Sequence, residues 1–309
     1  MRARRRWIPG LVAALAALAV AFGAVAYYFS GLIVAFDTPS LSENRAHFGA
    51  DLLSARGLPE PVEVSIPGAG VTLAAALFEQ PGPARCGVVL SHGRTGTRYG
   101  ILKYAPLVWT RGCDVVAIDA RCHGASTGEY CTMGYHEKHD LVAVVDWLAQ
   151  RLGLPRARIG ILGESMGAAI TLQAAALLPD IGFVAADCAY SDLRTILTVE
   201  GRRQYGLLVD LLLSPAMVIA GWRADAELDD VSPVRYAARI QAPVFLSHSR
   251  DDALIPWQHT EAIHAAIPHD HKVVYIVDWD APHGQSVERR PDEYARLFHD
   301  FLDRYTTGF

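Results

Sequence analysis

Ser165 stands between two glycines, where a strand-like stretch meets an alanine-rich one. The stretch "RIGILGESMGAA" at residues 158–169 places Gly163 and Gly167 two positions to either side of this serine. A sharp turn from strand to helix would hold the serine in strained geometry with Oγ clear of the sheet, and glycines avoid collisions in such a turn. The pattern predicts a nucleophile elbow; the alternative is a glycine-rich helix start with an N-cap serine.

A serine hydroxyl is a weak nucleophile at neutral pH and needs a base beside it. Of the twelve histidines, His283 in "DWDAPHGQS" is the best candidate. It follows the last predicted strand, and the adjacent Gly284 allows close approach.

The base in turn needs a carboxylate that orients its imidazole. "LSHSRDDALIP" follows the penultimate predicted strand and offers Asp251 and Asp252, of which Asp252 is preferred. Asp187, at the end of "FVAAD", is the third candidate; its structural alternative is a capping carboxylate at a strand end.

An acyl-transfer reaction also needs backbone donors for the oxyanion of its intermediate. The N–H of Met166 is one expected donor because it begins the helix after the serine. The second is expected in the loop after "VVLSHG", most simply the N–H of Arg94.

Metal and phosphate motifs are not matched. "HEKH" at 136–139 has one residue too few between its histidines for a zinc helix, and "HDH" at 269–271 lacks further ligands nearby. "GRTGTRYG" has no terminal lysine for a phosphate loop. We therefore expect no metal and no cofactor.

Strand-like and helix-like segments alternate along most of the chain, which predicts a parallel sheet with helices on both faces. In such a sheet the reactive groups gather at the carboxyl ends of the strands. Residues 191–239 contain no predicted strand and include "YGLLVDLLLSPAMVIAGW", so they are interpreted as a small helical cap. The predicted strands are 62–66, 71–79, 87–93, 115–119, 158–163, 182–189, 242–248 and 272–278; the main predicted helices are 101–110, 137–151, 166–178, 257–267 and 291–304.

Six motifs in order, "SHGRTG", "DARCHGASTGEY", "YHEKHDLVAVVDWL", "GESMGAA", "SRDDALIP" and "APHGQS", resemble the α/β-hydrolase superfamily. They are most similar to its esterase, monoacylglycerol-lipase and serine-aminopeptidase-like branch, including membrane-anchored bacterial members. The resemblance covers about residues 62–306. It implies a mostly parallel eight-stranded sheet and the catalytic order Ser165, Asp252, His283. One departure is Cys122 in "RCHG", where relatives usually have glycine.

The N-terminus is a separate segment. "MRARRRW" carries four arginines, and no charge follows from Trp7 to Phe36. This run is long enough to span a bilayer, and the flanking charges predict a cytoplasmic N-terminus and an extracytoplasmic domain. A cleaved signal peptide is the alternative, because Ala24-Val25-Ala26 fits a cleavage site and the arginines faintly resemble a twin-arginine signal. The expected organisation is an anchor at 1–36, a linker at 37–61 and a hydrolase domain at 62–309.

The composition of the chain argues against a nucleic-acid partner. The chain has 309 residues and a formal net charge of −5, so it lacks the basic footprint of a nucleic-acid-binding protein. The five cysteines do not form a disulfide framework. In an exported domain they allow pairs, since Cys86 and Cys113 each precede a predicted strand and Cys122 and Cys131 flank one loop. Cys188 is left over; unpaired cysteines are the alternative.

The main functional hypothesis is a serine hydrolase that cleaves carboxylic esters through an acyl-enzyme. The apolar cap and the predicted bilayer suggest acyl-lipid or other lipophilic substrates. A triad does not choose between ester and amide, so a serine peptidase or amidase is the first alternative. A non-catalytic, membrane-anchored binding module is the second.

Overall fold

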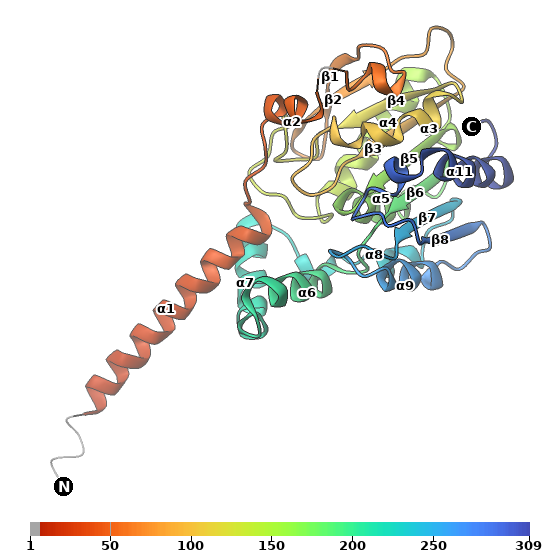
Figure 1. The fold of residues 1–309 in the computed structure, drawn as a ribbon. Coiled ribbons are helices and arrows are strands. Elements are labelled where there is room, and N and C mark those ends of the chain that lie inside the picture. Colours follow the sequence, from red (N-terminus) through yellow and green to blue (C-terminus); the bar gives the residue numbers. More distant parts are fainter. Residues whose placement is uncertain (1–6, 50) are drawn as a thin grey trace.

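An eight-stranded sheet is the centre of the fold in the computed structural model, which describes residues 7–49 and 51–309 (Figure 1). The strand order is β1-β2-β4-β3-β5-β6-β7-β8. β2 pairs antiparallel with β1 and β4, and the other neighbours are parallel, which confirms the predicted sheet. The strands are β1 (Val62–Pro67), β2 (Thr72–Phe78), β3 (Cys86–Ser91), β4 (Cys113–Ile118), β5 (Ile159–Glu164), β6 (Phe183–Asp187), β7 (Val244–Ser249) and β8 (Lys272–Val277).

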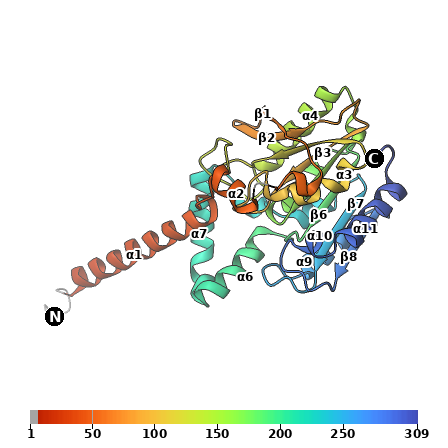
Figure 2. The same cartoon turned by 45° about the horizontal axis from the view of Figure 1, so that its top comes forward.

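Helices cover both faces of this sheet (Figure 2). Each face has its own apolar core. One core contains side chains of α4 (Glu137–Leu152), α5 (Met166–Ala175), α8 (Pro233–Ala237) and α9 (Gln258–Ala266). The other contains side chains of α3 (Pro106–Trp109), α10 (Ser286–Arg289) and α11 (Pro291–Tyr305). Strands β3, β4 and β7 are buried along their whole length, as expected for strands whose two faces are both covered by helices.

Residues 191–239, the predicted cap, hold two longer helices that form a hairpin. α6 (Leu193–Tyr205) begins at Asp192, whose carboxylate accepts the N–H of Thr195, and ends before Gly206. α7 (Leu208–Ala224) follows and includes Pro215. A 3₁₀ turn at Leu228–Asp230 and α8 then return the chain to the sheet.

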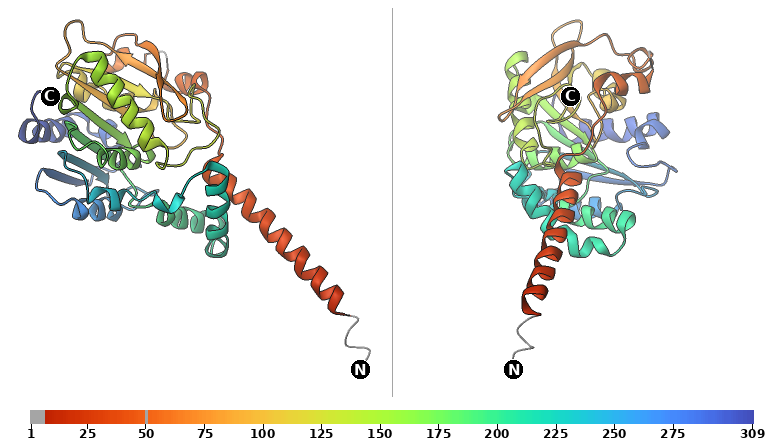
Figure 3. Two further views of the ribbon diagram at one scale, coloured as in Figure 1. Left: turned by 180° about the vertical axis from the view of Figure 1, so that it is seen from behind. Right: turned by 90° about the vertical axis from the view of Figure 1, so that its left-hand side faces the viewer.

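The N-terminal helix α1 (Ile8–Val34) projects from the rest of the chain (Figure 3). Of the described residues, it is the one helix long and apolar enough to cross a membrane. Its last turns pack against α7, where Arg223 donates to the Ser30 hydroxyl at 2.9 Å. The linker contains α2 (Leu41–Phe48), capped by Ser40 and Glu43. The four arginines used to predict orientation lie at residues 1–6, outside the described residues.

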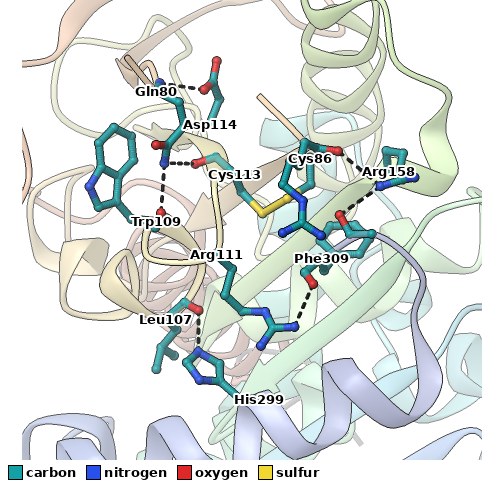
Figure 4. The surroundings of a disulfide bond; sticks show 12 residues. Gln80, Cys86, Leu107, Trp109, Arg111, Cys113, Asp114, Arg158, His299 and Phe309 are labelled. Atoms are coloured by element: carbon teal, nitrogen blue, oxygen red, sulfur yellow. Dashed lines mark hydrogen bonds between the residues drawn. A yellow bond between two sulfur atoms is a disulfide. The ribbon is translucent and has the colours of Figure 1, made fainter. Parts of the chain in front are cut away.

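Cys86 and Cys113 form a disulfide between the first residues of the neighbouring strands β3 and β4 (Figure 4). Chain segments around the disulfide are tied by hydrogen bonds: the Gln80 amide donates to the Cys113 carbonyl at 3.1 Å, and Arg111 donates to the Phe309 carbonyl at 2.7 Å. The other three cysteines are free, so the second possible pair, Cys122 with Cys131, does not form.

Candidate active site

Ser165 occupies a strained turn between β5 and α5. Its backbone has φ 56° and ψ −117°, and a positive φ is rare for residues other than glycine. A Cβ on Gly163 would lie 2.3 Å from the carbonyl atoms of Gly167, and a Cβ on Gly167 would lie 2.0 Å from the Ser91 oxygen. Both glycines are therefore required by the turn, for the reason that the sequence suggested.

The loop after β8 places His283 against Asp252. His283 Nδ1 lies 2.6 Å from Asp252 Oδ2, so this nitrogen donates to the carboxylate. The other carboxylate oxygen accepts the N–H groups of Leu254 and Ile255, at 2.8 and 2.9 Å. The carboxylate is thus held by the loop that follows β7 and presents one oxygen to the imidazole.

His248 completes the surroundings of Asp252 and was not anticipated from the sequence. It is fully buried on β7, and its Nε2 lies 3.0 Å from Asp252 Oδ2. Burial alone would raise the pKa of Asp252, but hydrogen bonds from His248 and His283 hold this pKa well below its usual range. Asp252 is therefore ionised at neutral pH.

The other two candidate carboxylates lie elsewhere. Asp187 accepts hydrogen bonds from the Tyr104 hydroxyl at 2.5 Å and from the Ser247 hydroxyl at 2.8 Å. Asp251 is exposed, and its side chain makes no hydrogen bond to another described residue. Neither carboxylate orients His283.

Ser165 and His283 line the same cavity. Among the described residues, the Ser165 hydroxyl has no hydrogen-bond partner, and His283 Nε2 lies 3.9 Å from Cys188 Sγ. Hydrogen bonds between nucleophile and base are often long without substrate and tighten when it binds. Burial lowers the pKa of His283, but the hydrogen bond and charge of Asp252, with Glu164 and Asp187 nearby, raise it overall.

The expected oxyanion donors border the same cavity, together with Gly93. Met166 is the first residue of α5, so its N–H has no carbonyl one turn earlier in the helix to bond. The N–H of Arg94 donates to no other described residue. The Arg94 side chain turns away to the end of α1, where it donates to the Leu32 carbonyl at 3.0 Å and lies over the ring of Phe36.

A lysine, also not anticipated from the sequence, connects the serine turn to the histidine loop. Lys103 Nζ lies 3.0 Å from Glu164, which directly precedes Ser165, and donates to the Gly284 carbonyl at 2.5 Å. Gly284 has φ 67°, and a Cβ there would lie 2.1 Å from Glu164 Oε1. A side chain at position 284 would therefore displace the Glu164 carboxylate from its place beside Lys103.

The cavity has a volume of about 470 Å³ and a mostly apolar wall. α6 and α7 supply much of that wall, including Ile196, Val209 and Leu213. The end of α1 contributes Phe29, Leu32 and Ile33. One sequence signal for this third part is that the uncharged apolar run extends to Phe36, well beyond the possible cleavage site at Ala24–Ala26.

Three side chains of the site could also offer ligand atoms to a metal: Cys188, Asp252 and His283, whose donor atoms lie within 4.8 Å of one another. A cation there would occupy the nitrogen with which His283 faces the cavity. The same arrangement also suits acid–base chemistry without a metal, in which a carboxylate orients an imidazole that accepts a proton from a hydroxyl.

The chain is similar to a known hydrolase family, to a bacterial relative and to solved structures of hydrolases. Residues 106–308 match the prolyl oligopeptidase family. The uncharacterized protein YqkD of Bacillus subtilis is 33% identical over 218 residues, which make up 70% of each chain. An esterase of Pyrococcus furiosus superposes with a TM-score of 0.65 at 24% identity, over 82% of this chain and 95% of the esterase. An acylaminoacyl peptidase of Pyrococcus horikoshii has a TM-score of 0.62 at 17% identity, over 84% of this chain and 44% of the peptidase. These structural likenesses establish the α/β-hydrolase fold.

Proposed function

Since this chain belongs to the prolyl oligopeptidase family and is a serine hydrolase of the α/β-hydrolase fold, we propose that it cleaves lipophilic carboxylic esters through an acyl-enzyme. The observation that carries the proposal is the 2.6 Å contact between His283 and Asp252 at a mainly apolar cavity that Ser165 also lines.

In the proposed reaction, His283 Nε2 accepts the proton of the Ser165 hydroxyl while Oγ attacks the ester carbonyl carbon. The carbonyl electrons move onto the oxygen, which accepts hydrogen bonds from the N–H groups of Arg94 and Met166. The intermediate collapses, its bond to the alkoxy oxygen breaks, and His283 returns the proton to the departing alcohol. Water then repeats these steps on the acyl-enzyme and releases the carboxylic acid.

A fluorophosphonate probe tests the nucleophile. Wild-type protein should be labelled, and Ser165→Ala should lose labelling together with hydrolysis of p-nitrophenyl esters. Ser191→Ala is a matched control because Ser191 bonds to His259 on another part of the fold. An unlabelled wild-type protein would overturn the proposal and favour the non-catalytic binding module.

A peptidase is the second candidate function, and Glu200 of α6 favours it. Its side chain borders the cavity, and its Oε1 is buried without a hydrogen-bond partner among the described residues. A free carboxylate oxygen there suits the amine of a peptide substrate. If the protein is a peptidase, aminoacyl anilides will be cleaved faster than acyl esters, and Glu200→Gln will slow only the anilides.

We also propose that α1 remains as a membrane anchor with the hydrolase domain outside the cytoplasm. α1 continues without a break through Ala24–Ala26, the possible cleavage site. The disulfide between Cys86 and Cys113 suits an oxidising compartment. The mass of the protein purified from membranes tests this, since cleavage would remove the first two dozen residues or so.

A further inference from the structure

α7 carries an apolar stripe on its outer surface. The stripe consists of Leu208, Leu211, Val218 and Trp222, whose spacings of three, seven and four residues place them on one face of the helix. Leu208 is 69% exposed and Trp222 is 81% exposed, and Leu207, just before the helix, is 77% exposed. Large apolar side chains gathered on one surface mark a site of contact with a partner or a membrane.

The exposure of α1 fixes where a bilayer would lie. All residues from Ile8 to Val25 are exposed, and Ala26 is the first buried residue of the helix. At about 1.5 Å per residue, residues 8–25 extend for about 27 Å, close to the hydrocarbon thickness of about 30 Å. Trp7 and Tyr28 flank this span and are exposed, as expected for aromatic residues at the two membrane surfaces.

The turn between α6 and α7 lies beside the end of that exposed span. We call Tyr205, Leu207, Leu208 and Leu211 the α6–α7 corner. The ring of Tyr205 packs edge-to-face on Phe29 of α1, with centroids 4.9 Å apart, only four residues beyond Val25. Figures 1 and 2 show the hairpin of α6 and α7 protruding from the domain on the side from which α1 leaves. The corner therefore reaches the level of the expected membrane surface.

Charges next to the corner do not oppose this placement. Asp210 accepts two hydrogen bonds from Arg202, at 2.8 and 2.9 Å, so the two charges neutralise each other. Arg203 donates to the Ala253 carbonyl and pairs with Glu200 at 3.5 Å. The remaining surface of the corner is formed by aliphatic and aromatic side chains.

We propose that the α6–α7 corner inserts into the surface of the lipid bilayer spanned by α1. The cavity wall includes Tyr205 of the corner and the neighbouring Phe29 and Val209, so the corner would bring the cavity to the membrane surface. An acyl ester dissolved in the bilayer would then enter without crossing water. The inference rests on the proposed anchor, and its substrate route also rests on the proposed ester hydrolysis.

Fluorescence quenching tests the insertion directly. The full chain is reconstituted in phosphatidylcholine nanodiscs whose acyl chains are brominated near the headgroup. Leu208→Trp adds one tryptophan at the corner, and the control Leu177→Trp adds one after α5, at a site of 37% exposure. We expect the brominated lipid to quench the fluorescence added at 208 and not that added at 177. Equal quenching at both positions would overturn the proposal.

Kinetics test the substrate route. The double variant Leu207→Glu/Leu208→Glu should hydrolyse a long-chain ester dissolved in nanodiscs about tenfold more slowly than wild type, because inserting two carboxylates into the bilayer is unfavourable. Its hydrolysis of water-soluble p-nitrophenyl butyrate should be unchanged, since neither residue borders the cavity. Leu177→Glu should change neither rate.

The outcomes separate the two proposals. If wild type hydrolyses neither ester, the proposed function fails, and the quenching experiment still decides the insertion. If the double variant hydrolyses the bilayer ester at the wild-type rate, the substrate route through the corner fails.

Discussion

His283 should set the pH dependence of the reaction, because only a neutral imidazole can accept the Ser165 proton. The carboxylates around it raise its pKa above the ordinary value of about 6.5. We therefore expect kcat/KM for an ester to fall as pH drops through an apparent pKa above 6.5. Glu164→Gln removes one neighbouring charge and should shift this acid limb to lower pH. An acid limb at the same pH in wild type and Glu164→Gln would contradict the assignment.

The sequence predicted the candidate nucleophile, base and carboxylate, but not the residues that surround them. Ser165 and His283 were predicted because each has a local signature, with glycines around one and a glycine beside the other. Asp252 was preferred over its neighbour Asp251, and the structure places Asp252 against the imidazole. The role of His248 was not predictable, since an isolated histidine in a strand has no signature of its partner.

Cys122 is the residue at which this chain departs from the family pattern. The sequence raised the question of its loop because relatives usually have glycine there. The structure gives Cys122 a φ of 58°, in the left-handed region that favours glycine. The loop therefore keeps a backbone conformation suited to glycine with a cysteine in its place.

Lys103 connects the turn that holds Ser165 with the loop that holds His283, and its ion pair with Glu164 should stabilise both. Lys103 lies in the 3₁₀ turn at Gly100–Tyr104 and is largely buried with Glu164. Lys103→Met leaves the Glu164 carboxylate without its partner, which should cost about 3–5 kcal/mol in the free energy of unfolding. Urea unfolding measures this loss.

Adding Glu164→Gln to Lys103→Met should restore part of that stability, because no unpaired charge then remains. Activity should stay low in the double variant, since Lys103 no longer holds the Gly284 carbonyl beside His283. A double variant no more stable than Lys103→Met would show that the charge pair does not account for the loss.

Elements with strong local patterns were predicted closely. The strand–turn–helix around Ser165 and the helix α11 differ from their predicted limits by only a few residues. The helix predicted at 101–110 is instead a 3₁₀ turn followed by the short α3, which begins at Pro106. Apolar spacing did not reveal this break, because both pieces bury the same kind of side chain.

At the scale of the whole molecule, two buried histidines should make the folded protein less stable at acidic pH. Burial lowers the pKa of His92 and of His123 to about 4. Both stay neutral in the folded protein, whereas the unfolded chain takes up protons below about pH 6.5. The two histidines therefore do not lower the free energy of unfolding above that pH. As pH falls from 6.5 toward 4, protonation of the unfolded chain lowers this free energy by ~3 kcal/mol for each histidine.

Urea unfolding at about pH 7 and about pH 5 measures this effect. His123→Asn removes one of the two titrating groups, so its loss of stability between these pH values should be smaller than that of wild type. An equal loss in the two proteins would contradict the role of His123.

The relation of α1 to the rest of the molecule could not be derived from local patterns. An apolar run of this length indicates a membrane span or a signal, and neither implies a contact with residues two hundred positions later. The packing of Ser30 against Arg223 becomes visible only in three dimensions.

Because Phe29, Leu32 and Ile33 form part of the cavity wall, α1 should also affect which substrates the cavity accepts. A shortened, water-soluble version that begins after Phe36 would have a wider and more open cavity, and the Arg94 side chain would lose its Leu32 carbonyl. Substrate preferences measured on such a version should therefore differ from those of the full chain.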